Sequence, residues 1–267
     1  MLQTGVNLGI LLASLATYLL AAYPKRYVFL VGVVPAVLVW WIRRHVPEPE
    51  EWHAAKKQAS RHEPRALDLF RGSVRRTTLL TMVVCACSLT AWWAFLFWNN
   101  QHLRNLSELA AWPTEKRDRF VSAAFFLVIA VSMGGNFFAG AVAWWLGYRR
   151  GVALLFACFF VSMFGAFCVE RSHEELMFWI VATGFFSGVF GLFTMYLPPL
   201  FPTLLRTTGA GFCFNIGRIA AAGGTVFFGL FAQVGDFRKA LLYASFLFIP
   251  AMLVALRLPD LRLDEEQ

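Results

Sequence analysis

An arginine stands inside one of the long apolar stretches of this sequence. Arg218 lies near the middle of the stretch Thr207–Val234. Its helical face also carries Asn215, Ala222 and Thr225. A charged side chain at the centre of a membrane is costly, so this guanidinium should face a cavity or a partner. We expect it to contact an anionic solute or the path that such a solute takes. The alternative is a structural bond to backbone carbonyls of a broken neighbouring helix.

Two amides are further candidates for contact with a solute. Asn136 lies in the apolar stretch Phe120–Leu146, and Asn215 precedes Arg218 by one helical turn. Amides and a guanidinium can fix the polar groups of a small molecule within an otherwise apolar cavity. The sequence therefore predicts that Asn136, Asn215 and Arg218 line one central cavity.

The remaining polar residues exclude several kinds of chemistry. All 16 carboxylates and all five histidines lie outside the apolar stretches. A hydrolase needs a nucleophile paired with a base, and a metal enzyme needs a set of ligands. Cys85 and Cys87 are two residues apart and point to different faces of a helix, so they make a poor metal pair. We predict no enzyme, no metal site and no cofactor.

Eight apolar runs position these residues. The composition is 58% hydrophobic and 15% charged, which does not suit a soluble globule. A helix needs roughly 20 apolar residues to cross a bilayer, and lipid cannot satisfy free backbone groups, so each such run must be a helix. The sequence predicts an all-α, polytopic membrane protein with eight transmembrane helices and the lipid bilayer as its partner. The expected spans are Gly5–Ala22, Tyr27–Ile42, Thr77–Trp98, Phe120–Leu146, Val152–Val169, Leu176–Leu197, Thr207–Val234 and Ala240–Leu256.

The formal charge of +8 comes from basic residues in loops, which set the topology of a membrane protein, and does not indicate a nucleic-acid partner. Residues 43–76 contain nine basic and five acidic side chains and form the one large charged loop. With this loop inside, 14 of the 24 basic residues lie on the inner side and nine on the outer side. We therefore expect a multi-pass protein of the cell membrane, inner or plasma, with both termini in the cytoplasm.

Residues Ala66–Phe70, within this loop, resemble a short amphipathic turn at the cytoplasmic surface. The alternative is a solvated linker with no specific partner. Two later spans carry small residues at helical spacing, which lets membrane helices approach closely. Packing and sliding are both compatible with this pattern. The small residues are Ser132, Gly135, Asn136, Ala139, Gly140 and Ala143 in one span, and Gly184, Gly188 and Gly191 in the other.

Three motifs stand in the order of one transporter family. The first reads Tyr196-Leu-Pro-Pro-Leu-Phe-Pro-Thr-Leu-Leu-Arg-Thr-Thr-Gly209, followed by Asn215-Ile-Gly-Arg218. It resembles the junction of the tenth and eleventh helices of the major facilitator superfamily, in its sugar and organic-acid porter branches. Phe29-Leu-Val-Gly-Val-Val-Pro35 with its basic exit resembles the sixth helix. Gly140-Ala-Val-Ala-Trp-Trp-Leu-Gly147-Tyr-Arg149-Arg150 resembles the eighth helix and its turn into the ninth.

The resemblance implies that the chain holds helices five to twelve of such a fold. Residues 1–42 would be a two-helix remnant of the amino-terminal bundle, and 43–76 the cytoplasmic loop between bundles. Residues 77–256 would form an intact carboxyl-terminal six-helix bundle, and 257–267 a cytoplasmic tail. Without helices one to four, this chain alone is not expected to transport. An internal start codon, a decayed gene, and a second polypeptide that supplies the missing amino-terminal helices are the alternatives.

The resemblance implies secondary transport, as in a symporter, of a small polar solute such as an organic acid or sugar, and a coupling ion is a further candidate partner. Trp92 and Trp93 occupy the aromatic pair position of the family's seventh helix, where rings can stack on a solute. Lipid contact or core packing is the alternative for both tryptophans. A different class of function is a non-transporting membrane protein that binds a partner through the loop 43–76.

A cytoplasmic loop motif also follows from the resemblance. It comprises Gly140, Gly147, Arg149, Arg150 and Arg206. Relatives usually carry an acid where this chain has Trp144, and another where it has Pro199. Those acids help to hold a cytoplasmic charge network, so we expect a weakened latch in this half of the molecule.

Overall fold

The computed structural model describes residues 2–19, 26–45, 50–58, 65–232 and 236–260. Every regular element in these ranges is helical, which confirms the all-α class. The chain divides into two compact units, Met1–Pro64 and Arg65–Gln267. The second unit therefore begins inside the loop expected at 43–76. The division into remnant, loop, bundle and tail stays a prediction.

The described residues of the first unit form four helices. They are α1 (Leu2–Leu19), α2 (Arg26–Val31), α3 (Val34–His45) and α4 (Glu50–Gln58). The expected span Tyr27–Ile42 is divided between α2 and α3 by a turn. Pro35 explains this break, because it has no N–H to donate to the carbonyl of Val31 and its ring would clash there. A proline is tolerated in the first turn of α3, where that donor has no partner within the helix.

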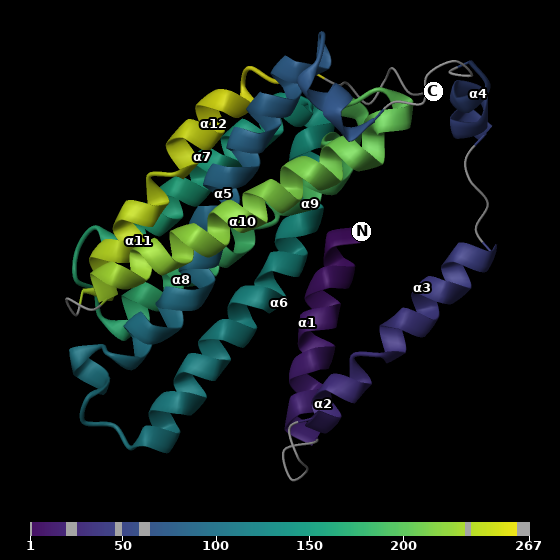
Figure 1. Ribbon diagram of the computed structural model, residues 1–267. Helices are drawn as coiled ribbons and strands as arrows, with labels where there is room; N and C mark the ends of the chain where they lie inside the picture. The colour runs from purple at the N-terminus through teal and green to yellow at the C-terminus, as the bar shows by residue number, and fades with distance from the viewer. Residues whose placement is uncertain (1, 20–25, 46–49, 59–64, 233–235, 261–267) are drawn as a thin grey trace. The chain divides into compact units, whose positions relative to one another are not determined.

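The second unit contains the helices that are long and apolar enough to cross a membrane (Figure 1). In the described residues there are six such crossings, so the expected total of eight stays a prediction. Four are α5 (Val74–Arg104), α6 (Thr114–Leu146), α7 (Tyr148–Phe167) and α10 (Arg206–Ala232). The other two are α8 (His173–Phe186) with α9 (Val189–Tyr196), and α11 (Phe237–Ser245) with α12 (Phe248–Ala255).

Short 3₁₀ turns connect or precede these helices. They are η1 (Ala66–Phe70), η2 (Ser107–Leu109), η3 (Pro198–Leu200) and η4 (Thr203–Leu205). Helices α5 and α6 are longer than the expected apolar spans. Helix α5 continues to Arg104 instead of ending at Trp98, and α6 begins at Thr114 instead of Phe120. Consequently His102, which the sequence places outside an apolar span, lies on the last turn of α5.

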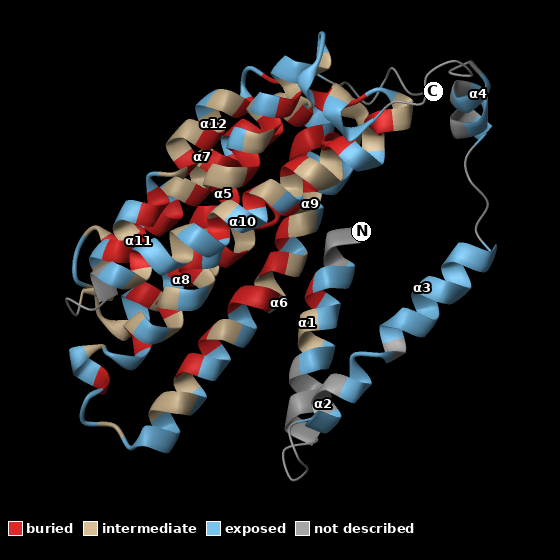
Figure 2. Cartoon of the chain, in the orientation of Figure 1, coloured by how far each residue is buried: buried red, intermediate tan, exposed pale blue. Residues whose placement is uncertain are grey.

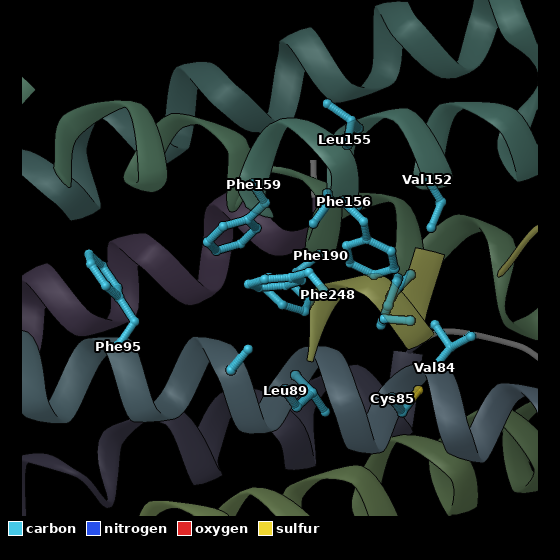
Figure 3. Packing of buried hydrophobic residues seen from close by; sticks show 14 of the residues in the cluster. Val84, Cys85, Leu89, Phe95, Val152, Leu155, Phe156, Phe159, Phe190 and Phe248 are labelled. Atoms are coloured by element: carbon cyan, nitrogen blue, oxygen red, sulfur yellow. The ribbon is translucent and has the colours of Figure 1, made fainter. Parts of the chain in front are cut away.

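Aromatic side chains from several helices form the core of the second unit (Figure 3). The rings of Phe159 on α7 and Phe248 on α12 stack with their centroids 4.2 Å apart. Phe156 packs against Phe248 from the next turn, and Phe190 of α9 meets Phe159 edge to face. Figure 2 shows the buried residues gathered along α5, α7 and α12. Here the core is an aromatic cluster that holds α7, α9 and α12 in fixed register.

Two helix pairs lie beside this core. Helix α10 packs mainly along α5, and α6 packs mainly against α8. These two pairs carry the residues that the sequence singles out as candidates.

Candidate functional site

A groove runs between α5 and α10, with a volume of about 440 Å³. Ligand pockets in proteins are typically about 300–1,000 Å³, so a small solute fits within it. We call it the α5–α10 groove. Its lining consists of Trp93, Phe97 and Trp98 from α5, and Arg218, Ala221, Ala222, Thr225 and Val226 from α10.

Close contact between the two helices creates the floor of this groove. The indole Nε1–H of Trp98 donates a hydrogen bond to the backbone oxygen of Thr225, at 3.0 Å. The same indole lies so close to Gly229 that a Cβ there would come within 2.6 Å of the ring. Farther along, Gly224 faces the side chain of Thr90 with no room for a methyl group. Glycines therefore bring α10 against α5, and the tryptophan fixes their spacing.

Arg218 gives the groove its chemistry. In the part of the chain that the structure describes, it carries the only charge among the lining residues. Trp93 and Phe97 provide aromatic walls, and both side chains are exposed. A planar guanidinium beside aromatic faces can bind a carboxylate through two parallel hydrogen bonds while the rings cover the apolar part of the molecule. The expectation that Arg218 faces a cavity agrees with this geometry.

Asn215 lies on the same side of α10 as Arg218 but does not line the groove. Its side chain is exposed, and its Nδ2–H donates to the backbone oxygen of Gly211 at 2.9 Å. This bond holds the amide against its own helix. Asn215 therefore lies outside the groove lining, one turn from the guanidinium.

The tryptophan pair is divided between two environments. Trp93 lines the groove, whereas Trp92 packs in the core against Phe95, Phe159 and Phe190. Consecutive helical residues point about 100° apart, and this rotation turns Trp92 toward the core while Trp93 faces the groove. Core packing, the alternative given above, describes Trp92.

Asn136 lies in a different place, at the break between α8 and α9. A Cβ added to Gly191 would come within 3.0 Å of the Asn136 Oδ1. The Nδ2 of Asn136 is buried and has no hydrogen-bond partner among the described residues. The structure therefore does not join Asn136 to the lining of the α5–α10 groove.

Glycines form the contact between α6 and α8–α9, which we call the glycine seam. Its members are Gly135 on α6 and Gly184, Gly188 and Gly191 on the facing helices. A Cβ on Gly135 would overlap the backbone of Phe185, and one on Gly188 would overlap the backbone of Gly135. The small-residue pattern is thus used for backbone-to-backbone packing. Gly140, from the same stripe and the cytoplasmic loop motif, has open space beside it.

The cytoplasmic loop motif surrounds the turn between α6 and α7. Gly147 forms this turn with φ of 79°, a conformation that residues with a side chain rarely adopt. Two residues later, the Arg149 guanidinium pairs with the Asp260 carboxylate at 3.0 Å. Arg150 is exposed, and Arg206 is the first residue of α10.

Sequence reasoning missed the acid that pairs with Arg149. Asp260 lies in the segment expected to be a cytoplasmic tail, yet Leu258 before it is fully buried. The Tyr196 hydroxyl donates to the backbone oxygen of Pro259 at 2.7 Å, and its ring stacks on Tyr148. Asp260 therefore supplies one acidic partner to Arg149 of the cytoplasmic loop motif. A Leu-Pro-Asp sequence directly after the last span was the available signal.

Phe97 and Trp98 were also missed as neighbours of Arg218. Trp93 and Phe97 are four residues apart, which places them on one face of α5. Which helix faces that stripe depends on long-range packing, so the sequence pattern does not supply Arg218 as its partner.

Comparisons with known proteins agree with the architecture. Residues 1–197 match the profile of the Major Facilitator Superfamily. A probable 4-methylmuconolactone transporter from Cupriavidus pinatubonensis is 30% identical over 237 residues, covering 84% of this chain and 52% of that protein. The sialic acid transporter NanX of Escherichia coli is 26% identical over 223 residues, covering 81% and 51%. The cis,cis-muconate transport protein of Acinetobacter baylyi is 26% identical over 276 residues, covering 100% and 65%.

The chain thus spans about half to two-thirds of the length of these relatives. The profile covers well over half of the chain. Its members are transporters and not enzymes, which confirms the prediction that the protein is not an enzyme. Six apolar crossings in the described residues make the protein a multi-pass membrane protein. The chain belongs to the Major Facilitator Superfamily.

Proposed function

We propose that the protein serves secondary transport of a small polar solute, an organic acid or a sugar, and that the α5–α10 groove contacts this solute. Relatives named for muconate, a muconolactone and sialic acid support the class of solute. A coupling ion completes the proposal, as in a symporter. Such an ion would bind outside the groove, because the described lining contains no carboxylate.

Arg218 is the observation that carries this proposal. It is the charged group of a groove whose walls are Trp93 and Phe97, within a segment that crosses the membrane. A guanidinium at that depth is costly unless it has an aqueous path or an anionic partner. A carboxylate solute supplies that partner, so an organic acid is favoured over a neutral sugar.

Binding to the purified chain tests the role of Arg218. The unfolding temperature in detergent would be followed while cis,cis-muconate, sialic acid or a neutral sugar is titrated. Arg218→Gln removes a charge-assisted hydrogen bond worth roughly 1.5–3 kcal/mol, so we expect about ten- to a hundredfold weaker binding of the acid. Arg218→Lys keeps the charge but loses the planar fork, so we expect an intermediate loss.

Arg150→Gln is the matched control, since it removes an exposed arginine that does not line the groove. It should bind the acid with unchanged affinity. Unchanged affinity in both Arg218 variants would show that this residue is structural and would refute the assignment. Uptake into liposomes then separates transport from the rival class. Acid that binds at Arg218 but never crosses, for this chain and for one extended upstream, would favour a non-transporting protein that acts through residues 43–76.

We place the protein in the cell membrane with both termini in the cytoplasm. The excess of basic residues on the side of the loop 43–76 supports this topology. Cysteines introduced at Ala54 and Asn100 would report it through their reactivity with an impermeant reagent. The two positions should react from opposite sides, and labelling from the same side would refute the arrangement.

A further inference from the structure

The turn η1 is folded back onto the bundle instead of extending away from it. The Thr78 hydroxyl, one turn inside α5, donates to the backbone oxygen of Leu69 at 2.8 Å. The Leu69 side chain is 0% exposed, and the Phe70 ring meets Phe212 of α10 edge to face. Gly72 makes the reversal between η1 and α5 with φ of 55°. The backbone of η1 therefore lies beside the first turns of two membrane-crossing helices.

This position fixes the depth of η1 in the membrane. Thr78 belongs to a helix whose apolar part crosses the bilayer. A group that is hydrogen-bonded to Thr78 lies level with the end of that crossing. The layer at this level contains the lipid headgroups, which add about 5–8 Å on each side of the hydrocarbon core.

The exposed side chains of η1 and its flanking residues have two properties. Leu67 is 68% exposed and Phe70 is 37% exposed, although both are apolar. Arginines flank these two residues in the sequence, and we call the whole set the basic entry patch. It comprises Leu67 and Phe70 with Arg65, Arg71, Arg75 and Arg76, all four of which are exposed.

The acidic residue of this segment is already engaged. One oxygen of Asp68 accepts the backbone N–H of Arg65 at 2.7 Å, and the other pairs with Arg71 at 3.5 Å. The segment from Arg65 to Arg76 thus contains four arginines and one carboxylate. The net charge of this segment is therefore positive, and its neighbours in the sequence include the exposed apolar residues Leu67 and Phe70.

Exposed apolar side chains with neighbouring arginines suit binding at a membrane surface. Exposed Leu67 and Phe70 gain free energy by entering the boundary between headgroups and acyl chains. The guanidinium groups then reach phosphate diesters and bind them with charge-assisted hydrogen bonds. We propose that the basic entry patch binds anionic phospholipid headgroups and so anchors the start of α5 to the membrane surface. This site is independent of the solute groove.

Titration with a soluble lipid tests the proposal on the whole chain. The unfolding temperature in detergent would be measured against dioctanoyl-phosphatidylglycerol, with dioctanoyl-phosphatidylcholine and inorganic phosphate as comparisons. We expect stabilisation by phosphatidylglycerol alone. Arg75→Gln with Arg76→Gln should weaken its apparent affinity about thirtyfold, since each basic residue near an anionic surface accounts for about a fivefold change. Arg104→Gln with Arg119→Gln, which removes the same charge at the opposite end of α5 and the start of α6, should leave it unchanged.

Further variants keep the result decisive. Arg71→Gln lies outside α5 and should lower the affinity about fivefold even if the double variant does not fold. Leu67→Ser should weaken binding in a way that high salt does not mask, because its contribution is apolar. Equal affinities in the Arg75/Arg76 and Arg104/Arg119 pairs would overturn the proposal. An equal shift with phosphatidylcholine, or with inorganic phosphate, would overturn the assignment to an anionic lipid headgroup.

Discussion

The glycine seam and the α5–α10 contact both depend on glycine, but they place different groups opposite it. In the seam, Gly135 and Gly188 meet backbone atoms of the facing helix. Between α5 and α10, Gly224 and Gly229 beside the groove meet the side chains of Thr90 and Trp98, whereas Gly217, nearer the start of α10, meets the backbone of Cys85. Backbone cannot retreat without moving a whole helix, whereas a side chain can change rotamer. The α5–α10 contact is therefore adjustable beside the groove, at Gly224 and Gly229, while the seam at Gly135 and Gly188 is rigid.

This difference explains where a groove can exist. The seam closes α6 on α8–α9 so tightly that Asn136 is confined beside Gly191. The α5–α10 contact leaves Trp93 and Arg218 at an open groove. For the small-residue stripes of α6 and α8–α9, the contacts at Gly135 and Gly188 favour packing, and sliding stays a hypothesis. We infer that α6, α8 and α9 move as one body and that any adjustment around a solute occurs between α5 and α10.

The largest effect is expected from overfilling the seam. Gly188→Leu would push a side chain into the backbone of Gly135, and no rotamer change can relieve that overlap. We expect a loss of about 3 kcal/mol in the free energy of unfolding, at the upper end for overpacked sites. Denaturant titration in detergent would measure it. Gly134→Leu is the matched control, because a Cβ at Gly134 meets nothing within 4 Å. Equal destabilisation by the two variants would show that the seam is not rigid.

A smaller loss is expected for the same kind of change between α5 and α10. Gly224→Ala places a methyl group against the Thr90 Cγ2, which is part of a side chain that can move. We expect a cost of about 1 kcal/mol. Thr90→Ser removes that methyl group, so the double variant should recover most of the loss. Gly223→Ala, with open space at its Cβ, should not destabilise the fold. A cost in Gly224→Ala as large as in Gly188→Leu would remove the distinction between the two interfaces.

Sequence reasoning reached the elements of this comparison but not their partners. Apolar length located α5, α6, α7 and α10, and residue spacing located the small stripe through Gly135. What faces each stripe depends on the register of helices that are distant in the chain. For that reason Trp98 was not foreseen beside Thr225, and Asp260 was not foreseen beside Arg149. Asn136 was grouped with Arg218 on residue type and Trp92 on the family resemblance, although rotation about each helix places both elsewhere.

The tryptophan hydrogen bond sharpens the comparison from the adjustable side. Trp98→Phe removes the donor to the Thr225 oxygen and leaves a ring of smaller area against Gly229. We expect a stability loss of about 1 kcal/mol, typical of one hydrogen bond, together with weaker binding of an acidic solute because the groove wall moves. Trp145→Phe, at an exposed position on α6, is the control and should change neither quantity. Lost stability with unchanged solute affinity would show that this wall does not shape the groove.

The smallest effect concerns the contact that ties η2, between α5 and α6, to the start of α8. His173 donates its ring Nδ1–H at 2.8 Å and its backbone N–H at 3.0 Å to one oxygen of Glu108. These bonds hold the pKa of the Glu108 carboxyl below its ordinary value. A depressed folded-state pKa means that the contact adds stability above the unfolded-state pKa, and that this stability is lost as pH falls through the folded value. Glu108→Gln should therefore be slightly less stable than the natural protein at neutral pH, and the difference should disappear as the pH falls through the folded-state pKa of the Glu108 carboxyl. Unfolding midpoints of both proteins from neutral to acidic pH would measure it.

Glu174→Gln, an exposed neighbour in the first turn of α8, should not show the same convergence. A difference that is independent of pH would mean that Glu108 acts through packing, and that the bond between the two regions is not electrostatic.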